Sequence, residues 1–135
     1  MKSQRLTLII LVMLGFSLTF SACGGSKEVE YEVELKEFSF TPGSISAPAG
    51  ATVMLTLNNI GLLEHEFVIM KLGTTATLPF DADDEPNVYW EGEVEPGEKE
   101  TCEFVAPSEP GEYQVVCGTA GHLEQNMMGK LIVTK

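Results

Sequence analysis

The sequence has few of the residues from which disulfide scaffolds and nucleic-acid surfaces are built. Its 135 residues include three cysteines, two histidines and only eight lysines and arginines, against 20 aspartates and glutamates, so the formal charge is −12. Three cysteines cannot form a disulfide framework, and a surface this acidic repels phosphate groups. The composition therefore excludes a disulfide-rich scaffold and a nucleic-acid partner.

Helical apolar periodicity is also scarce, and apolar residues instead alternate with polar ones. Val29, Tyr31, Val33 and Leu35 alternate with charged residues, which is the pattern of a strand with one buried face. Similar short runs recur to the end of the chain, separated by turns that draw on 13 glycines and seven prolines. About seven to eight such strands predict an all-β fold, an antiparallel β-sandwich of Greek-key type.

The first residues have the features of an export signal. Lys2 and Arg5 form a positively charged start, an apolar run follows, and two small residues precede Cys23. The run is too short for a comfortable membrane-spanning helix. Residues 1–22 therefore resemble the signal of a bacterial lipoprotein, in which the cysteine, here Cys23, is lipidated and becomes the new N-terminus.

This interpretation divides the chain into three parts. Residues 1–22 are the signal peptide, residues 23–34 hold the lipidated cysteine, a tether and the start of the first strand, and residues 35–135 form the domain. We expect the domain at the periplasmic or extracellular face of the cell membrane, lipid-anchored through Cys23. An ordinary signal peptide and an uncleaved N-terminal anchor are the alternatives, and both also place the domain outside the cytoplasm.

A thiol, an imidazole and a thioether fall close together near the C-terminus. Cys117, His122 and Met127 lie in a segment that leaves one predicted strand and enters the last. Thiolate and thioether sulfur suit Cu(I), imidazole suits both copper states, and two histidines, a cysteine and a weak axial methionine form the ligand set of blue-copper sites. The second imidazole can come only from His65, because the chain has two histidines.

The spacing Cys-x4-His-x4-Met-x-Gly, with one histidine far upstream, resembles the copper loop of the cupredoxins, the type 1 blue copper proteins of the plastocyanin, azurin and auracyanin group. The resemblance covers most of residues 35–135 and implies a cupredoxin-like sandwich that binds one copper ion as Cu(I) or Cu(II). It implies that Cys117 is the thiolate ligand and that His65 and His122 complete a trigonal plane. Met127 would be the long axial ligand. The leader also resembles that of membrane-tethered, auracyanin-type members.

Three residues beside these ligands affect the details of the site. Met128 is an alternative axial ligand, but the family's methionine stands two residues before the glycine, here Gly129, and this favours Met127. Family members often have asparagine after the first ligand histidine, where this sequence has Glu66. Together with Glu64, it places two acidic groups next to a ligand. Close to the metal, they would favour Cu(II) and lower the reduction potential.

We expect a one-electron carrier rather than an enzyme. Four protein ligands leave no open coordination position for a substrate, and two histidines cannot supply the further clusters of multicopper oxidases. We expect a monomer whose acidic surface steers it toward redox proteins, such as a c-type cytochrome or a membrane electron-transfer complex. The electron-transfer surface would be mostly apolar and would comprise His122, Leu62, Leu63, Ala120 and Met128.

Three alternatives assign other roles to the same residues. An extracytoplasmic copper chaperone or copper-storage protein would use the same ligands but hand the ion over. A disulfide between Cys102 and Cys117, which export permits, would abolish the site. A metal-free, adhesion-type sandwich would make the spacing of cysteine, histidine and methionine a coincidence.

Overall fold

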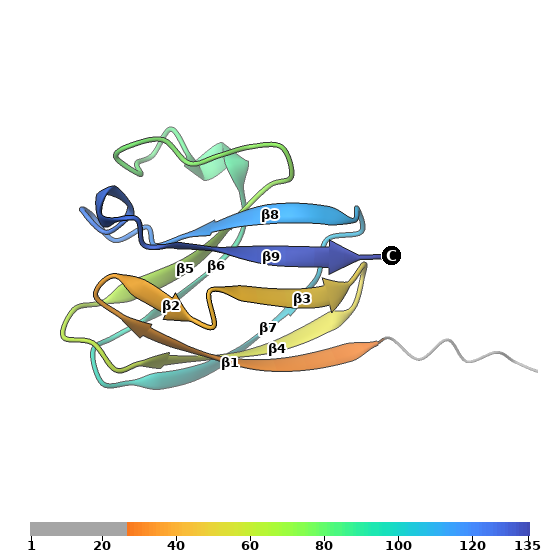
Figure 1. Cartoon of the computed structure of the whole chain (residues 1–135), viewed down its shortest axis with the longest axis horizontal. Coiled ribbons are helices and arrows are strands. Elements are labelled where there is room, and N and C mark those ends of the chain that lie inside the picture. The colour runs from red at the N-terminus through yellow and green to blue at the C-terminus, as the bar shows by residue number, and fades with distance from the viewer. Residues whose placement is uncertain (1–26) are drawn as a thin grey trace, which may run out of the picture.

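A computed structural model describes residues 27–135, so the predicted signal peptide and Cys23 lie outside the described residues. Within them, nine β-strands form two sheets that pack face to face (Figure 1). The elements are β1 (Glu28–Lys36), β2 (Ser39–Thr41), β3 (Ser44–Pro48), β4 (Thr52–Asn59), β5 (His65–Met70), the short 3-10 helix η1 (Glu85–Asn87), β6 (Val88–Val94), β7 (Lys99–Val105), β8 (Gly111–Val116), the 3-10 helix η2 (Leu123–Gln125) and β9 (Met128–Thr134).

The predicted all-β sandwich is confirmed. One sheet has the order β2-β1-β4-β7 and the other the order β3-β9-β8-β5-β6. Most neighbours are antiparallel, but β1 pairs with β4 and β3 pairs with β9 in parallel, so both sheets are mixed. Alternation in the sequence predicts which face of a strand is buried but carries no information on strand direction. The two parallel pairs therefore could not be anticipated.

Alternating side chains of the two sheets meet in one core. Along β4, Val53, Leu55 and Leu57 are fully buried, whereas the intervening residues are partly exposed. Phe67 and Ile69 of β5 face them from the other sheet and belong to the same cluster of buried residues. The connections β1–β2, β4–β5 and β8–β9 all lie at one end of this sandwich, at the left in Figure 1. The fold thus brings three segments that are far apart in the sequence to one end.

The two described cysteines lie in different sheets and are both free. Cys102 is in β7, opposite Leu55 of β4, and Cys117 directly follows β8. Because both thiols are free, the alternative disulfide between Cys102 and Cys117 is not formed.

The segment between β5 and β6 is organised around one buried carboxylate. Asp84 is 1% exposed and accepts hydrogen bonds from the backbone N–H and the hydroxyl of Thr77, both at 2.9 Å, and from the N–H of Asp81 at 3.1 Å. Burial raises the pKa of Asp84, but these hydrogen bonds outweigh burial and hold the pKa below its ordinary value of 3.8. The ionised carboxylate is thus the form that the fold stabilises.

We expect Asp84→Asn to lower the free energy of unfolding at neutral pH by about 1–3 kcal/mol, because the amide turns a donor toward groups that are themselves donors. A lowered folded pKa contributes stability that is present above the unfolded pKa and is lost as pH falls through the folded value. The difference from the wild type should therefore shrink in acid. Urea unfolding at neutral and acidic pH measures both effects.

Asp83→Asn is the matched control, because Asp83 is exposed and no hydrogen bond from residues 27–135 reaches its side chain. It should change stability by less than about 0.5 kcal/mol at either pH. Equal losses in the two variants would contradict the assigned role of Asp84.

Candidate metal centre

Three side chains from two loops converge at the end of the sandwich. His65 is the first residue of β5, Cys117 directly follows β8, and His122 precedes η2. The two Nδ1 atoms are 3.1 Å apart, and Cys117 Sγ lies 3.8 Å from His65 Nδ1 and 3.3 Å from His122 Nδ1. The centre of this triangle is about 2 Å from each atom, close to the 2.0–2.3 Å at which a comparable ion, zinc, binds nitrogen and sulfur. All three side chains are buried.

The segment that carries two of these side chains is fixed by its own backbone. The N–H of Cys117 donates to the carbonyl of Met127, and the N–H of Met127 donates to the carbonyl of His122, both at 3.1 Å. The turn at its end places Asn126 in the left-handed region, with φ of 62°. Met127 is fully buried, whereas Met128 is 44% exposed. Burial therefore favours Met127 over Met128 as the methionine available to the site, in agreement with the spacing.

The surroundings of the three ligand candidates favour their uncharged forms. Burial lowers the pKa of His65, and the neighbouring His122 lowers this pKa further. Burial also lowers the pKa of His122. Burial raises the pKa of Cys117, although hydrogen bonds from Thr119 and from the N–H of Glu66 oppose it. These lowered pKa values favour the neutral imidazoles, which can bind metal through Nδ1. Binding requires the loss of one thiol proton.

The donor set fits one copper ion, because it combines a soft sulfur with two neutral imidazole nitrogens and a buried thioether nearby. A family model described as a cupredoxin-like domain matches residues 7–133. The chain belongs to the cupredoxin family. The family resemblance seen in the loop spacing is therefore confirmed over almost the whole chain.

Solved structures and one curated relative resemble this cupredoxin. Auracyanin B is 26% identical, with a TM-score of 0.68 over 82% of this chain and 91% of that one. Reduced auracyanin from Roseiflexus castenholzii is 24% identical, with a TM-score of 0.65 over 82% of this chain and all of the auracyanin chain. This match shows that the two proteins share a fold. The copper-resistant cuproprotein CopI of Rubrivivax gelatinosus is 31% identical over 100 residues. That match spans 70% of this chain but only 59% of CopI.

The two acidic residues that flank His65 differ in their relation to the ligands of this cupredoxin. The N–H of Glu66 points at Cys117 Sγ at 3.4 Å, and its carboxylate lies against Gly118, where a side chain would collide with it. The carboxylate of Glu64 instead groups with Glu93 and Glu95, with oxygens within 4.8 Å of one another. These neighbours raise the pKa of Glu64, and burial together with Glu93 raises the pKa of Glu66. Of the two, Glu66 is the one that contacts a ligand.

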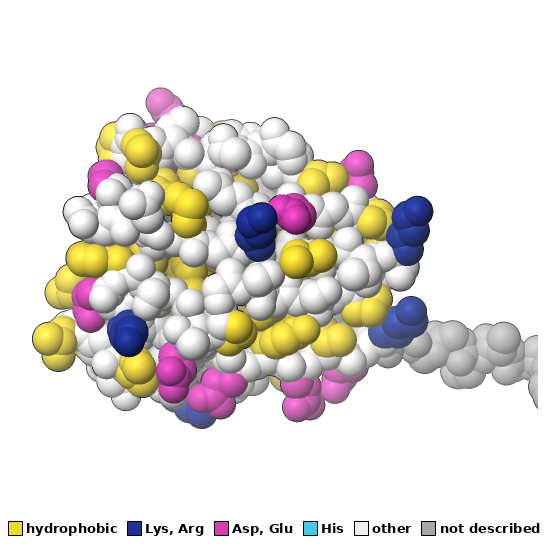
Figure 2. Space-filling view, in the orientation of Figure 1, with side chains coloured by type: hydrophobic (Ala, Val, Ile, Leu, Met, Phe, Trp, Pro, Cys, Tyr) yellow, Lys and Arg dark blue, Asp and Glu magenta, His cyan; other side chains and the backbone are white. Residues whose placement is uncertain are grey.

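The predicted apolar surface lies around His122, but the ring itself is only 3% exposed. Leu62 is 87% exposed, Leu63 49% and Met128 44%, and Ala120 is also exposed. Hydrophobic side chains gather at this end of the molecule, at the left in Figure 2. The exposed apolar atoms of this predicted surface thus come from these four residues rather than from His122.

Two residues at this end were not anticipated from the sequence. Phe38 packs edge-on against the His122 ring, with centroids 5.1 Å apart and an interplanar angle of 77°. Glu37 Oε1 lies 3.6 Å from Nε2 of His65. A signal for Glu37 was present, because its position continues the phase of Val33 and Leu35, which predicts an inward side chain.

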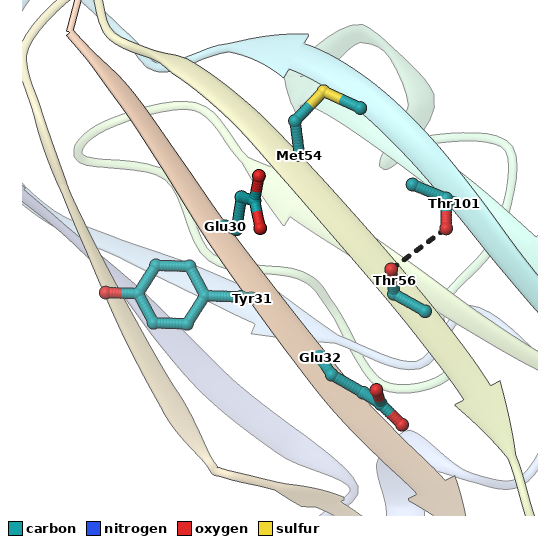
Figure 3. A pocket seen from close by; sticks show the side chains of 6 residues that line it. All are labelled: Glu30, Tyr31, Glu32, Met54, Thr56 and Thr101. Atoms are coloured by element: carbon teal, nitrogen blue, oxygen red, sulfur yellow. Dashed lines mark hydrogen bonds between the residues drawn. The ribbon is translucent and has the colours of Figure 1, made fainter.

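A separate hollow lies on the outer face of the sheet formed by β1, β4 and β7 (Figure 3). Its lining includes two carboxylates, Glu30 and Glu32, together with Met54 and the hydroxyls of Thr56 and Thr101, which are 2.9 Å apart. None of the converging ligand side chains lines it. The metal centre is therefore at the loop end of the sandwich and not on this sheet face.

The structure also bears on membrane association. Among residues 27–135, no helix combines the length and the apolar character that crossing a bilayer requires.

Proposed function

We propose that this cupredoxin carries single electrons between redox proteins outside the cytoplasm. Bound copper would supply the one-electron Cu(I)/Cu(II) couple. The observation that carries the proposal is the buried triangle of His65, Cys117 and His122, together with the burial of Met127. These four side chains would enclose a metal ion without an open position for a substrate, so turnover of a substrate is not part of the proposal.

The anchoring of the ligands suits a carrier, because fast transfer needs a site that rearranges little. His65 begins β5 and Cys117 follows β8, and these two strands pair at Val68–Val116 and Ile69–Val115. The hydroxyl of Thr119 donates to the carbonyl of Glu64 at 3.2 Å and ties the two ligand loops together. The paired strands and the loop-to-loop hydrogen bond would thus hold the proposed ligands in place.

The surface suits transient docking. Leu62, Leu63, Ala120 and Met128 would make a small apolar contact around His122, and weak complexes of redox proteins use small interfaces. Exposed acidic side chains are frequent on β1, where Glu28, Glu30, Glu32 and Glu34 are all exposed. Acidic side chains also gather at the bottom of the molecule in Figure 2. We infer that the protein acts as a monomer and that a basic partner, such as a c-type cytochrome, is attracted by this charge.

We expect the copper-loaded protein to exchange electrons rapidly with a basic c-type cytochrome and to give a reversible voltammogram. Because long-range attraction is screened by salt, the second-order rate should fall about tenfold or more between low and high ionic strength. Stopped-flow kinetics at several salt concentrations measure this effect.

The small anion hexacyanoferrate(III) is the control oxidant for that experiment. The −12 charge of the chain repels it, so its rate should rise with salt. Equal salt dependence for the anion and the cytochrome would contradict the steering role of the acidic surface.

A copper chaperone or storage protein is the second candidate function. The similarity to CopI, whose name describes a copper-resistant cuproprotein, favours it. Rapid loss of copper to a second metal-binding protein, together with sluggish electron exchange, would support this function over the carrier. The same measurements therefore separate the two.

The place of action is also a proposal. We infer that the domain is exported and is anchored to the outer face of the cell membrane by a lipid on Cys23. The lipoprotein-like pattern of residues 1–26 supports this, and β1 begins at Glu28, only a short tether beyond the cysteine.

A further inference from the structure

The distal nitrogen of one ligand candidate is buried without a partner. His65 is 0% exposed, and its Nε2 has no hydrogen-bond partner within the described part of the chain. Its Nδ1 faces the other two ligand atoms. A neutral imidazole carries one proton, so a metal on Nδ1 leaves that proton on Nε2. A buried N–H without an acceptor is costly, so the metal-loaded site needs an acceptor at this point.

Glu37 provides the nearest carboxylate. Its Oε1 lies 3.6 Å from His65 Nε2 and already accepts hydrogen bonds from the N–H groups of Leu62 at 2.7 Å and Leu63 at 2.8 Å. These bonds hold the carboxylate at the loop that leads into His65. The 3.6 Å separation is slightly longer than a hydrogen bond, so a small rotation of either group would close it.

The backbone leaves room for this approach. Gly61 lies beside both groups, and a Cβ there would be 2.8 Å from Glu37 Oε1 and 3.0 Å from His65 Nε2. A side chain at position 61 would therefore crowd both groups and force at least one of them to shift. The glycine, the two N–H donors and the unpartnered Nε2 therefore all point to one contact between Glu37 and His65.

We propose that Glu37 is a positioning residue for the metal centre, accepting the Nε2–H of His65 when metal is bound to Nδ1. The inference rests on the proposed copper site and extends it. The contact fixes the tautomer and orientation of His65 and makes the imidazole a stronger donor. Its negative charge favours Cu(II) over Cu(I). The carboxylate that faces the distal nitrogen of a ligand is thus Glu37, which lies in the β1–β2 turn, rather than Glu64.

Glu37→Gln tests the charge separately from the loop contacts, because the amide oxygen can still accept from Leu62 and Leu63. We expect the preference of the site for Cu(II) over Cu(I) to fall about tenfold, the lower end of losses on removing such partners, which raises the reduction potential by about 59 mV. Glu34→Gln, the same change on the exposed face of β1, should leave the potential unchanged. Equal potentials for the two variants would overturn the proposal.

A second measurement uses the zinc-loaded wild-type protein and needs no variant. The Nε2 proton of His65 should appear in the NMR spectrum as a slowly exchanging, hydrogen-bonded resonance. In Glu37→Ala, which removes the acceptor, it should exchange quickly. A fast-exchanging proton in the wild type would overturn the proposal even if the variants failed to fold. Failure of the copper function would show differently, as wild-type protein that stays colourless with copper while the zinc spectrum still reports on Glu37.

Discussion

Replacing Cys117 with serine is expected to abolish the intense blue or green colour of the copper-loaded protein. That colour would arise from charge transfer between the thiolate of Cys117 and Cu(II), and a serine hydroxyl does not ionise at neutral pH to replace it. Cys117 is fully buried, and its Sγ is 3.3 Å from one ligand nitrogen and 3.8 Å from the other. The substitution changes one atom at the centre of the site, so the loss should be complete. Visible absorption during titration with Cu(II) measures it.

Cys102→Ser is the matched control, because it makes the same one-atom change at a partly buried position of β7. Its colour and copper stoichiometry should equal those of the wild type. Urea unfolding of both apoproteins shows whether either change disturbs the fold. Colour that survives in folded Cys117→Ser would refute the ligand assignment.

The ligand positions could be predicted because they are close in the sequence or have no competitor. Cys117, His122 and Met127 share one loop, so their spacing alone indicates a common site. His65 follows by elimination, since there are only two histidines. The structure then explains how the pairing of β5 with β8 brings the two loops together. Local spacing was sufficient because the chemistry of the four side chains is so specific.

The surroundings of the ligands could not be predicted in the same way. The chain reverses after Lys36, and β2 pairs back onto β1. This reversal carries Glu37 to the loop containing Leu62 and Phe38 to the ring of His122. Such contacts depend on the parallel pairing of β1 with β4, which periodicity does not encode.

The acidic residues show the same limit. Glu64 and Glu66 both adjoin His65 in the sequence, and within a strand residues two apart would point to the same face. Glu64 precedes β5, and its carboxylate groups with Glu93 and Glu95. Glu66 lies within β5 opposite Glu93, and its backbone reaches Cys117. Adjacency to His65 in the sequence therefore did not predict which carboxylate faces its ring. That carboxylate belongs to Glu37, which is remote from His65 in the chain.

Asn59→Ala is expected to destabilise the protein more than other single changes near the ligand loops. Asn59 ends β4 and is 1% exposed. Its amide donates to the carbonyls of Leu63 at 2.8 Å and Val94 at 2.9 Å, and its oxygen accepts from the N–H of Gly61 at 2.9 Å. Each buried group left without a partner costs about 1–3 kcal/mol, so the total loss should reach roughly 3 kcal/mol or more. Urea unfolding of the apoprotein measures it.

The neighbouring Asn58 offers a control of identical chemistry, because it sits in the same strand and makes one exposed hydrogen bond, to Glu32 at 3.2 Å. Asn58→Ala should cost less than about 0.5 kcal/mol. The two variants should also differ at the metal centre, since the bonds of Asn59 hold the loop that contains Leu62 and leads into His65. Only Asn59→Ala should therefore weaken copper binding, by a loss of ligand order rather than of a ligand. Equal stability and equal copper affinity in the two variants would show that this loop is held by its strand pairing alone.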